Sequence, residues 1–337
     1  MITSKEFAKL IGVSQSTVSR AMNDSSLVPE EKRKIIQQKA GEYGFALNSQ
    51  ARGLKMNKTG TIGILFPKHF IDMNSNMMLA HLYDKIQKEM AQYDYDIMVI
   101  NNDNNSDFSS FERIIKRRKV DGFIVLKLEL SNTEMQLIEE NKIPCVFIMN
   151  TEQQIRKNIN YCFSDSEYGG YLAGKFFGKQ KDYQKIFITV KEEADDAGRR
   201  YQGFCRGLRE YQYEITENDI LYCNLMIPSA YETIMENHKR LINNKTAIFS
   251  YNDTIAIGVY NALRDLNINV PNEVQLIGMD DIPLVSWIRP AISTVHVNTE
   301  EMIPKACSFL IDKIENKQGT IGEWIKPQLI LRDTTLK

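Results

Sequence analysis

From Gly60 onward, short apolar runs rich in β-branched residues alternate with stretches of helical periodicity, and this alternation constrains the fold more than any other feature of the chain. It is typical of parallel βαβ units, in which helices cover the faces of a sheet. Eight strands are expected, at residues 61–66, 96–100, 122–126, 145–149, 185–190, 220–223, 246–251 and 274–279.

The alternating region spans about 275 of the 337 residues, which is too long for one simple doubly wound sheet. We therefore expect an α/β body of two similar doubly wound subdomains with a cleft between them. A single eight-stranded barrel remains the alternative, because eight βα repeats also satisfy the strand count.

The start of the chain carries a different pattern, with three short helical segments at 4–10, 15–23 and about 29–43. Thr3 and Ser14 are placed to cap the first two helices, and Gly44 is placed to end the third. Two short helices joined by a tight glycine-containing turn form a helix-turn-helix. The residues expected to supply its small core are Phe7, Ala8, Leu10, Val18, Ala21, Met22, Ile35, Ile36 and Ala40.

The net charge of −1 conceals an asymmetry between this head and the body. Residues 1–58 hold ten basic residues against five acidic ones, a net of +5, whereas the remaining 32 basic and 38 acidic residues give −6. The asymmetry predicts different partners for the two regions, although a solvated charged face would also account for it.

In a helix-turn-helix the second helix enters the major groove of DNA with its N-terminal residues at the base edges. Here those positions hold Gln15 and Ser16, with Arg20 one turn later. Glutamine can bond adenine twice and arginine can bond guanine twice, so these three side chains are predicted to contact bases. Short polar side chains suited to phosphate contacts are Thr3, Ser14, Thr17, Ser19 and Asn23. A protein-binding module with a polar face is the alternative.

Several classes of protein are excluded or disfavoured. No run of 18 apolar residues exists, and residues 1–20 lack the features of a secretory signal, so we expect a cytoplasmic protein with no membrane span. The five cysteines never occur in C-x-x-C spacing, and most of them are expected to be buried. Because the usual phosphate-loop, nucleophile-elbow and metalloprotease motifs are absent, no enzyme, metal or cofactor is predicted.

The string FAKLIGVSQSTVSRAMN (7–23) resembles the DNA-binding head of the LacI/GalR family of bacterial transcriptional regulators. The run ARGLK at 51–55 is similar to the hinge helix of that family, although Leu47 stands where the family usually has proline. Further similar strings are TGTIGILFP (59–67), YNDTIAIGVYNAL (251–263), VPNEVQLIGMDDIPL (270–284) and ISTVHVNTEEM (292–302).

The resemblance implies a head at 1–46, a hinge helix and linker at 47–59, and a body at 60–337 like the periplasmic sugar-binding proteins. Three chain crossings would join its two subdomains, which we expect at 60–162 with 293–321 and at 163–292 with 322–337. The resemblance also implies a homodimer on a near-palindromic double-stranded operator, because two-fold protein symmetry matches two half-sites. Leu54 would then wedge into the minor groove, beside a base contact from Lys55.

Ligands of open α/β sheets bind beyond the carboxyl ends of the strands. The polar or aromatic residues that follow expected strands are His69, Phe70, Asn150, Asn252, Asp253, Asp280 and Asp281. We expect effector contacts from all of these except Asp253 and Asp281, for which helix or turn capping remains an equal alternative. The family resemblance adds Arg200 as a residue that binds ligand hydroxyls and Phe163 as an aromatic against a sugar face.

These features predict a repressor of carbohydrate-use genes whose operator affinity is controlled by a sugar or sugar phosphate in the cleft. One alternative keeps the DNA-binding head but makes a phosphorylated carrier protein the controlling partner, as the resemblance to the catabolite control protein implies. A cytoplasmic solute-binding protein is the other alternative.

Overall fold

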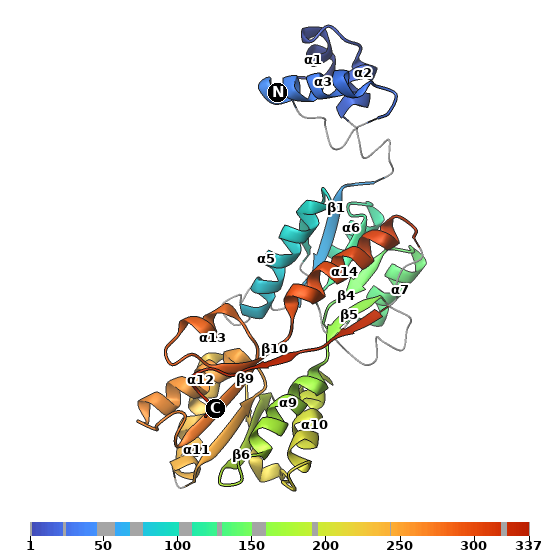
Figure 1. Ribbon diagram of the computed structural model, residues 1–337. Helices are drawn as coiled ribbons and strands as arrows, with labels where there is room; N and C mark the ends of the chain where they lie inside the picture. The colour runs from blue at the N-terminus through green and yellow to red at the C-terminus, as the bar shows by residue number, and fades with distance from the viewer. Residues whose placement is uncertain are drawn as a thin grey trace. The chain divides into compact units, whose positions relative to one another are not determined.

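The computed structural model describes residues 2–22, 25–45, 58–67, 77–100, 110–126, 130–149, 160–190, 195–242, 244–317 and 322–336. The chain divides into two compact units, Met1–Gly60 and Thr61–Lys337. Each unit is described by itself below, and Figure 1 labels the elements of both.

The head consists of the three expected helices, α1 (Ser4–Leu10), α2 (Gln15–Met22) and α3 (Glu30–Glu42). Thr3 caps α1 through a capping box with Glu6. The Ser14 hydroxyl oxygen accepts from the backbone N–H of Thr17 at 3.1 Å, as expected of a cap for α2. Both capping predictions are confirmed.

The core of the head contains most of the predicted residues, but two predictions are wrong. Leu10 and Ile35 are each 55 % exposed. In α3 the inward face holds Ile36 and Ala40, which are four residues apart, and Ile35 lies about 100° around the helix from this face. Phe45 completes the core instead, with its ring stacked on that of Phe7 at 4.2 Å between centroids.

The body contains two six-stranded sheets. The first has the order β11-β5-β4-β3-β1-β2. Its strands are β1 (Thr61–Leu65), β2 (Asp96–Ile100), β3 (Gly122–Val125), β4 (Cys145–Phe147), β5 (Tyr161–Ser164) and β11 (Gly322–Ile325). Two helices pack on one face, α5 (Met77–Gln92) and α14 (Thr299–Ile314). Two more pack on the other, α6 (Ser110–Lys116) and α7 (Asn132–Glu140).

The second sheet has the order β12-β10-β9-β8-β6-β7. Its strands are β6 (Gln184–Val190), β7 (Ile220–Cys223), β8 (Thr246–Ser250), β9 (Val274–Asp280), β10 (Ser293–His296) and β12 (Gln328–Ile330). One face is covered by α9 (Ser166–Gly178) and α10 (Asp195–Arg209). The other carries α11 (Ile227–Ile242), α12 (Asp253–Asp265) and α13 (Pro283–Trp287), and a short 3-10 helix, Glu217–Asp219, precedes β7.

Both sheets have the same doubly wound order, in which the first strand lies between the second and the third. Every described strand pair is parallel except β10 with β12. Two open sheets rule out the barrel alternative and support the prediction of two α/β subdomains. All eight expected strands are present, whereas β5, β10, β11 and β12 were missed, because each is short and contains polar residues, so that none forms a continuous apolar run.

The chain crosses between the sheets three times, after β5, after β10 and between β11 and β12, and Figure 1 shows the last of these crossings as a long ribbon. The expected boundaries at 162, 293 and 321 are each a few residues too early. Cross-strand pairing decides this, since β10 pairs with β9 in the second sheet and β11 pairs with β5 in the first.

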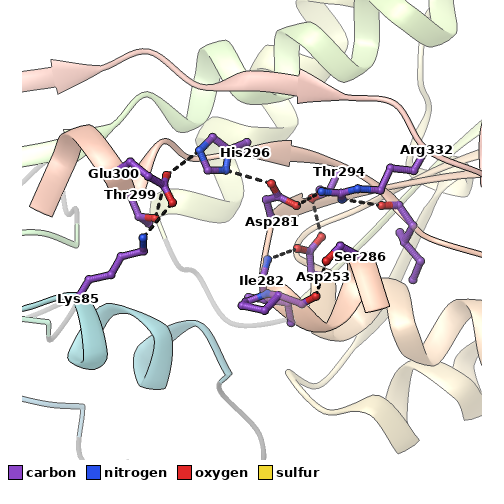
Figure 2. Close-up of polar contacts among 12 residues, drawn as sticks. Lys85, Asp253, Asp281, Ile282, Ser286, Thr294, His296, Thr299, Glu300 and Arg332 are labelled. Atoms are coloured by element: carbon purple, nitrogen blue, oxygen red, sulfur yellow. Dashed lines mark hydrogen bonds and ion pairs between the residues drawn. The ribbon is translucent and has the colours of Figure 1, made fainter. Parts of the chain in front are cut away.

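A chain of ion pairs spans the second crossing, between His296 and the start of α14 (Figure 2). Lys85 Nζ lies 2.9 Å from Glu300, and His296 Nε2 lies 2.9 Å from the same carboxylate. His296 Nδ1 lies 3.1 Å from Asp281, which in turn lies 2.6 Å from Arg332. We call these five residues the crossing network. It links α5 of the first subdomain to the ends of β9 and β12 in the second.

Helices α9 and α10 approach each other along a seam of glycines. An added Cβ at Gly170 would fall on the carbonyl oxygen of Arg200, and one at Gly203 would fall on that of Glu167. Gly174 and Gly207 continue the seam in the same way. Because only glycine permits backbones to come this close, the seam sets the position of α10 and of the side chains it carries.

The first prediction tests this seam. Gly203→Ala should lower the free energy of unfolding by about 1 to 3 kcal/mol, because the methyl group forces the helices apart. The matched control is Gly198→Ala, on the exposed side of α10 where an added Cβ meets nothing within 4 Å. It should be neutral or stabilising by about 0.5 to 1 kcal/mol. Urea unfolding of both variants measures the difference in their free energies of unfolding. Equal unfolding midpoints would contradict the claim that the seam requires glycine.

The second prediction concerns pH. Contact with the Asp281 carboxylate raises the pKa of His296 in the folded protein. The protonated His296 therefore stabilises the fold fully below the pKa of an unfolded histidine, and this stabilisation is lost as pH rises through the folded pKa. The stability lost in His296→Gln should therefore grow as pH falls from about 8 to about 6. Unfolding at both pH values measures this. His238→Gln is the control, since its Nδ1 contacts the Met235 carbonyl. A loss of stability in His296→Gln that is the same at both pH values would disprove a stabilising role of protonated His296.

Candidate functional site

One face of α2 is polar and open to solvent. Gln15, Ser16 and Arg20 are exposed, whereas Val18 and Ala21 on the opposite face are buried in the core of the head. The capped helix thus presents together the three side chains that the sequence predicts at base edges.

Four of the five predicted phosphate contacts lie in the described part of the head. Thr3 and Ser14 are exposed residues that also cap their helices, and the Ser14 hydroxyl lies 2.7 Å from that of Thr17. Ser19 is half-buried on α2. Three further predicted DNA contacts, Asn23, Leu54 and Lys55, lie outside the described residues, so their roles stay predictions.

At the carboxyl ends of the strands of the second sheet, polar side chains gather around Arg200. The guanidinium Nη2 lies 2.8 Å from Asp196 and 3.3 Å from Asp280, and Nη1 donates to the carbonyl oxygen of Tyr251. The guanidinium carbon of Arg200 lies 4.4 Å from the centroid of the Tyr251 ring. The Ser166 hydroxyl donates a hydrogen bond to the Asp196 carboxylate. We call these five residues the arginine cluster. Its Arg200 and Asp280 are two of the predicted effector residues.

Sequence reasoning missed the other three members as site residues. Asp196 precedes Arg200 by four residues on α10, a spacing that places ion-pair partners side by side on a helix and could have identified it. Tyr251 directly follows β8, so the rule about strand ends would also have found it. Ser166 begins α9, and only the close approach of α9 to α10 brings it to Asp196.

The arginine cluster is buried, and burial controls its electrostatics. Burial opposes the charge on Arg200, but Asp196 and Asp280 outweigh this effect and raise its pKa. Burial also raises the pKa of Asp280 to about 6, against the opposing effect of Arg200. Asp280 has a φ of 118°, a region that side-chain-bearing residues rarely adopt. Such strain is concentrated at functional sites.

Asn252 and Asp253, which follow β8, have structural roles. The Asn252 side chain caps α12 by accepting from the backbone N–H of Ile255 at 3.0 Å. Asp253 is fully buried, where it accepts from Thr294 at 2.6 Å and from the backbone N–H of Ile282 at 2.9 Å (Figure 2). The Asn252 carbonyl oxygen therefore has a structural partner, and its predicted effector contact stays a prediction.

Phe163 is 1 % exposed and packs in the core of the first subdomain, so its ring has no open face for a sugar. Trp324 lies beside it and is half-buried, with the Arg199 guanidinium 4.6 Å from the centroid of one of its rings. Trp324 is therefore the better-placed aromatic at this end of the sheet. The remaining predicted effector residues, His69, Phe70 and Asn150, lie outside the described residues.

All five cysteines are free and buried, as predicted. Within the described ranges, no three histidine, cysteine or acidic side chains gather as a metal site. None of the described helices has the length and apolar character that crossing a membrane requires.

The chain matches two family models, which together cover more than half of it. Residues 3–48 match the bacterial regulatory proteins of the lacI family, and residues 179–335 match a periplasmic binding protein-like domain. The chain is 27 % identical over 342 residues to the HTH-type transcriptional repressor PurR of Vibrio vulnificus, covering 100 % of this chain and 99 % of the relative.

Solved structures show the same fold. The transcriptional regulator CelR in complex with cellobiose gives a TM-score of 0.70 at 20 % identity, covering 98 % of this chain and 99 % of that one. A LacI family transcriptional regulator from Enterococcus faecium with bound ribose gives 0.70 at 21 % identity, covering 82 % and 100 %. The helix-turn-helix head is therefore that of the lacI family of bacterial regulatory proteins, and the two-subdomain body is a periplasmic binding protein-like domain.

Proposed function

We propose that this DNA-binding regulator is a repressor of carbohydrate-use genes, controlled by a small sugar-like effector bound at the arginine cluster. The observation that carries the effector proposal is the buried Nε of Arg200, which has no hydrogen-bond partner among the described residues. A buried polar atom left unpaired is costly, and a ligand acceptor would satisfy it.

On the DNA side, we propose that Gln15, Ser16 and Arg20 read base edges in the major groove, while Thr3, Ser14, Thr17, Ser19 and Asn23 contact phosphates. Leu54 and Lys55 keep their proposed minor-groove roles on the strength of the family resemblance. Two heads bind a near-palindromic operator because the regulator works as a homodimer. Trp287, which is 71 % exposed on α13, is a large apolar surface that a second copy would cover.

On the effector side, the relatives with bound ribose and cellobiose make neutral sugars the first candidates. An effector that prefers one arrangement of the two subdomains shifts operator affinity by no more than its differential affinity for the two states. The alternative of control by a phosphorylated carrier protein does not use the unpaired Arg200 Nε, and we therefore favour the small ligand. As a regulator of transcription, the protein is expected to act in the cytoplasm.

The third prediction tests the DNA face. Arg20→Ala should weaken operator binding by about 1 to 3 kcal/mol and relax the preference at one base pair, because a bidentate base contact is lost. Binding-site selection followed by fluorescence anisotropy measures both effects. The control is Lys34→Ala, which removes the same charge from α3, where Lys34 pairs with Glu30 on the surface. An unchanged selected motif for Arg20→Ala would contradict the assignment.

The fourth prediction tests the effector site by calorimetry, with ribose, cellobiose and other neutral sugars as probes. Asp280→Asn should weaken sugar binding about tenfold or more, because a hydrogen bond to a charged acceptor is lost. Arg200 keeps Asp196 as its partner in this variant, so no buried charge is left unpaired. Asp84→Asn, which breaks only a surface pair with Lys88, is the control. Equal sugar affinities for both variants would refute the site.

A further inference from the structure

The Arg200 guanidinium is already occupied by the protein's own acceptors. Nη2 faces two carboxylates, Asp196 at 2.8 Å and Asp280 at 3.3 Å, and Nη1 donates to the Tyr251 carbonyl oxygen. An arginine grips a phosphate or carboxylate through two parallel N–H groups of its planar fork. Here the Nη1–Nη2 edge of that fork is filled, and Nε is the nitrogen left without a partner.

Asp196 is held so that it cannot turn away from the guanidinium. One carboxylate oxygen accepts from Ser166, and the other accepts from the Tyr251 hydroxyl at 3.3 Å in addition to its contact with Arg200. The residue is only 8 % exposed. Its partners come from α9, from the end of β8 and from α10 itself, all in the second subdomain, so the arrangement does not depend on a ligand.

The charges of the arginine cluster therefore favour a neutral ligand. Two carboxylates face one guanidinium, and the neighbouring cation, Arg199, lies 3.6 Å from Asp165 and against Trp324. A phosphate at this position would bring a further negative charge beside both carboxylates. Like charges placed together in a buried site repel strongly, because little water screens them.

The two open positions of the cluster are matched by a hydroxyl. Arg200 Nε is a buried donor without a partner among the described residues. The Asp280 carboxylate faces Arg200 through Oδ1, and its second oxygen, Oδ2, is an acceptor that takes no part in that ion pair. A sugar hydroxyl accepts from the first and donates to the second. An unprotonated phosphate oxygen can only accept, and it would leave Oδ2 facing another negative charge.

We propose that Asp196 is a specificity residue that makes the arginine cluster select hydroxyl groups and reject phosphate. The effector is then a sugar whose edge at Arg200 is not phosphorylated. This inference rests on the proposed effector site and narrows the expectation of a sugar or sugar phosphate.

The first experiment compares matched ligands on the full-length wild-type protein by calorimetry, using ribose against ribose 5-phosphate and glucose against glucose 6-phosphate. In each pair that binds, the neutral sugar should bind at least about tenfold tighter than its phosphate. A phosphorylated member that binds equally well or better would overturn the proposal while leaving the effector site in place.

The second experiment uses inorganic phosphate as the probe and needs no knowledge of the natural effector. Asp196→Asn keeps the shape of the side chain and removes its charge, so it should bind phosphate at least about tenfold tighter than the wild type. The control is Asp265→Asn, which removes the same charge from the last residue of α12. Asn252 caps the other end of that helix.

Equal phosphate affinities for Asp196→Asn, the control and the wild type would overturn the proposal. Circular dichroism checks the fold of each variant, and Asp196→Ser is the second variant should Asp196→Asn unfold. If no neutral sugar binds the wild type, the sugar effector itself is wrong, whereas the phosphate comparison still decides whether Asp196 rejects anions.

Discussion

The burial of the Arg200 guanidinium is the constraint on which the candidate site depends. A buried charge is tolerated only with partners, and here Asp196 and Asp280 provide them. The three groups act as a unit, because removing the arginine would leave two buried carboxylates unpaired, whereas removing one carboxylate leaves the arginine with the other. Substitutions at the carboxylates are for this reason more informative about ligand binding than truncation of Arg200.

Two features of the body keep this unit in position. The glycine seam brings α10 against α9, so that Ser166 reaches Asp196. At the end of β9, both aspartates have positive φ, 118° at Asp280 and 59° at Asp281, and their side chains serve different networks. Asp280 pairs with Arg200, while Asp281 joins the crossing network through His296 and Arg332. Consecutive residues thus connect the proposed effector site to the segment that links the subdomains, and this is the contact through which we propose that ligand binding influences their arrangement.

Much of this architecture was predictable from local patterns. The head helices and their caps depend on residues within one turn of each other, and the capping box of Thr3 with Glu6 is an example. The eight expected strands lie in apolar runs that can be recognised without their neighbours. Arg200 and Asp280 were assigned to the site by resemblance and by position after a strand, and the structure brings them to 3.3 Å. The short strands β5, β10, β11 and β12 were missed because their identity depends on the neighbours with which they pair.

The sequence by itself thus determined the helix-turn-helix head, the polar face of α2, the βα alternation of the body and two residues of the arginine cluster. Only the tertiary structure decided three further points. The Asn252 carbonyl oxygen caps a helix, Phe163 is enclosed in the core, and Ser166 and Tyr251 both bond to Asp196. The physical reason is distance along the chain. Capping and periodicity are interactions between near neighbours, whereas the burial of a ring and the pairing of a charge depend on which distant segments the packed helices and sheets bring together.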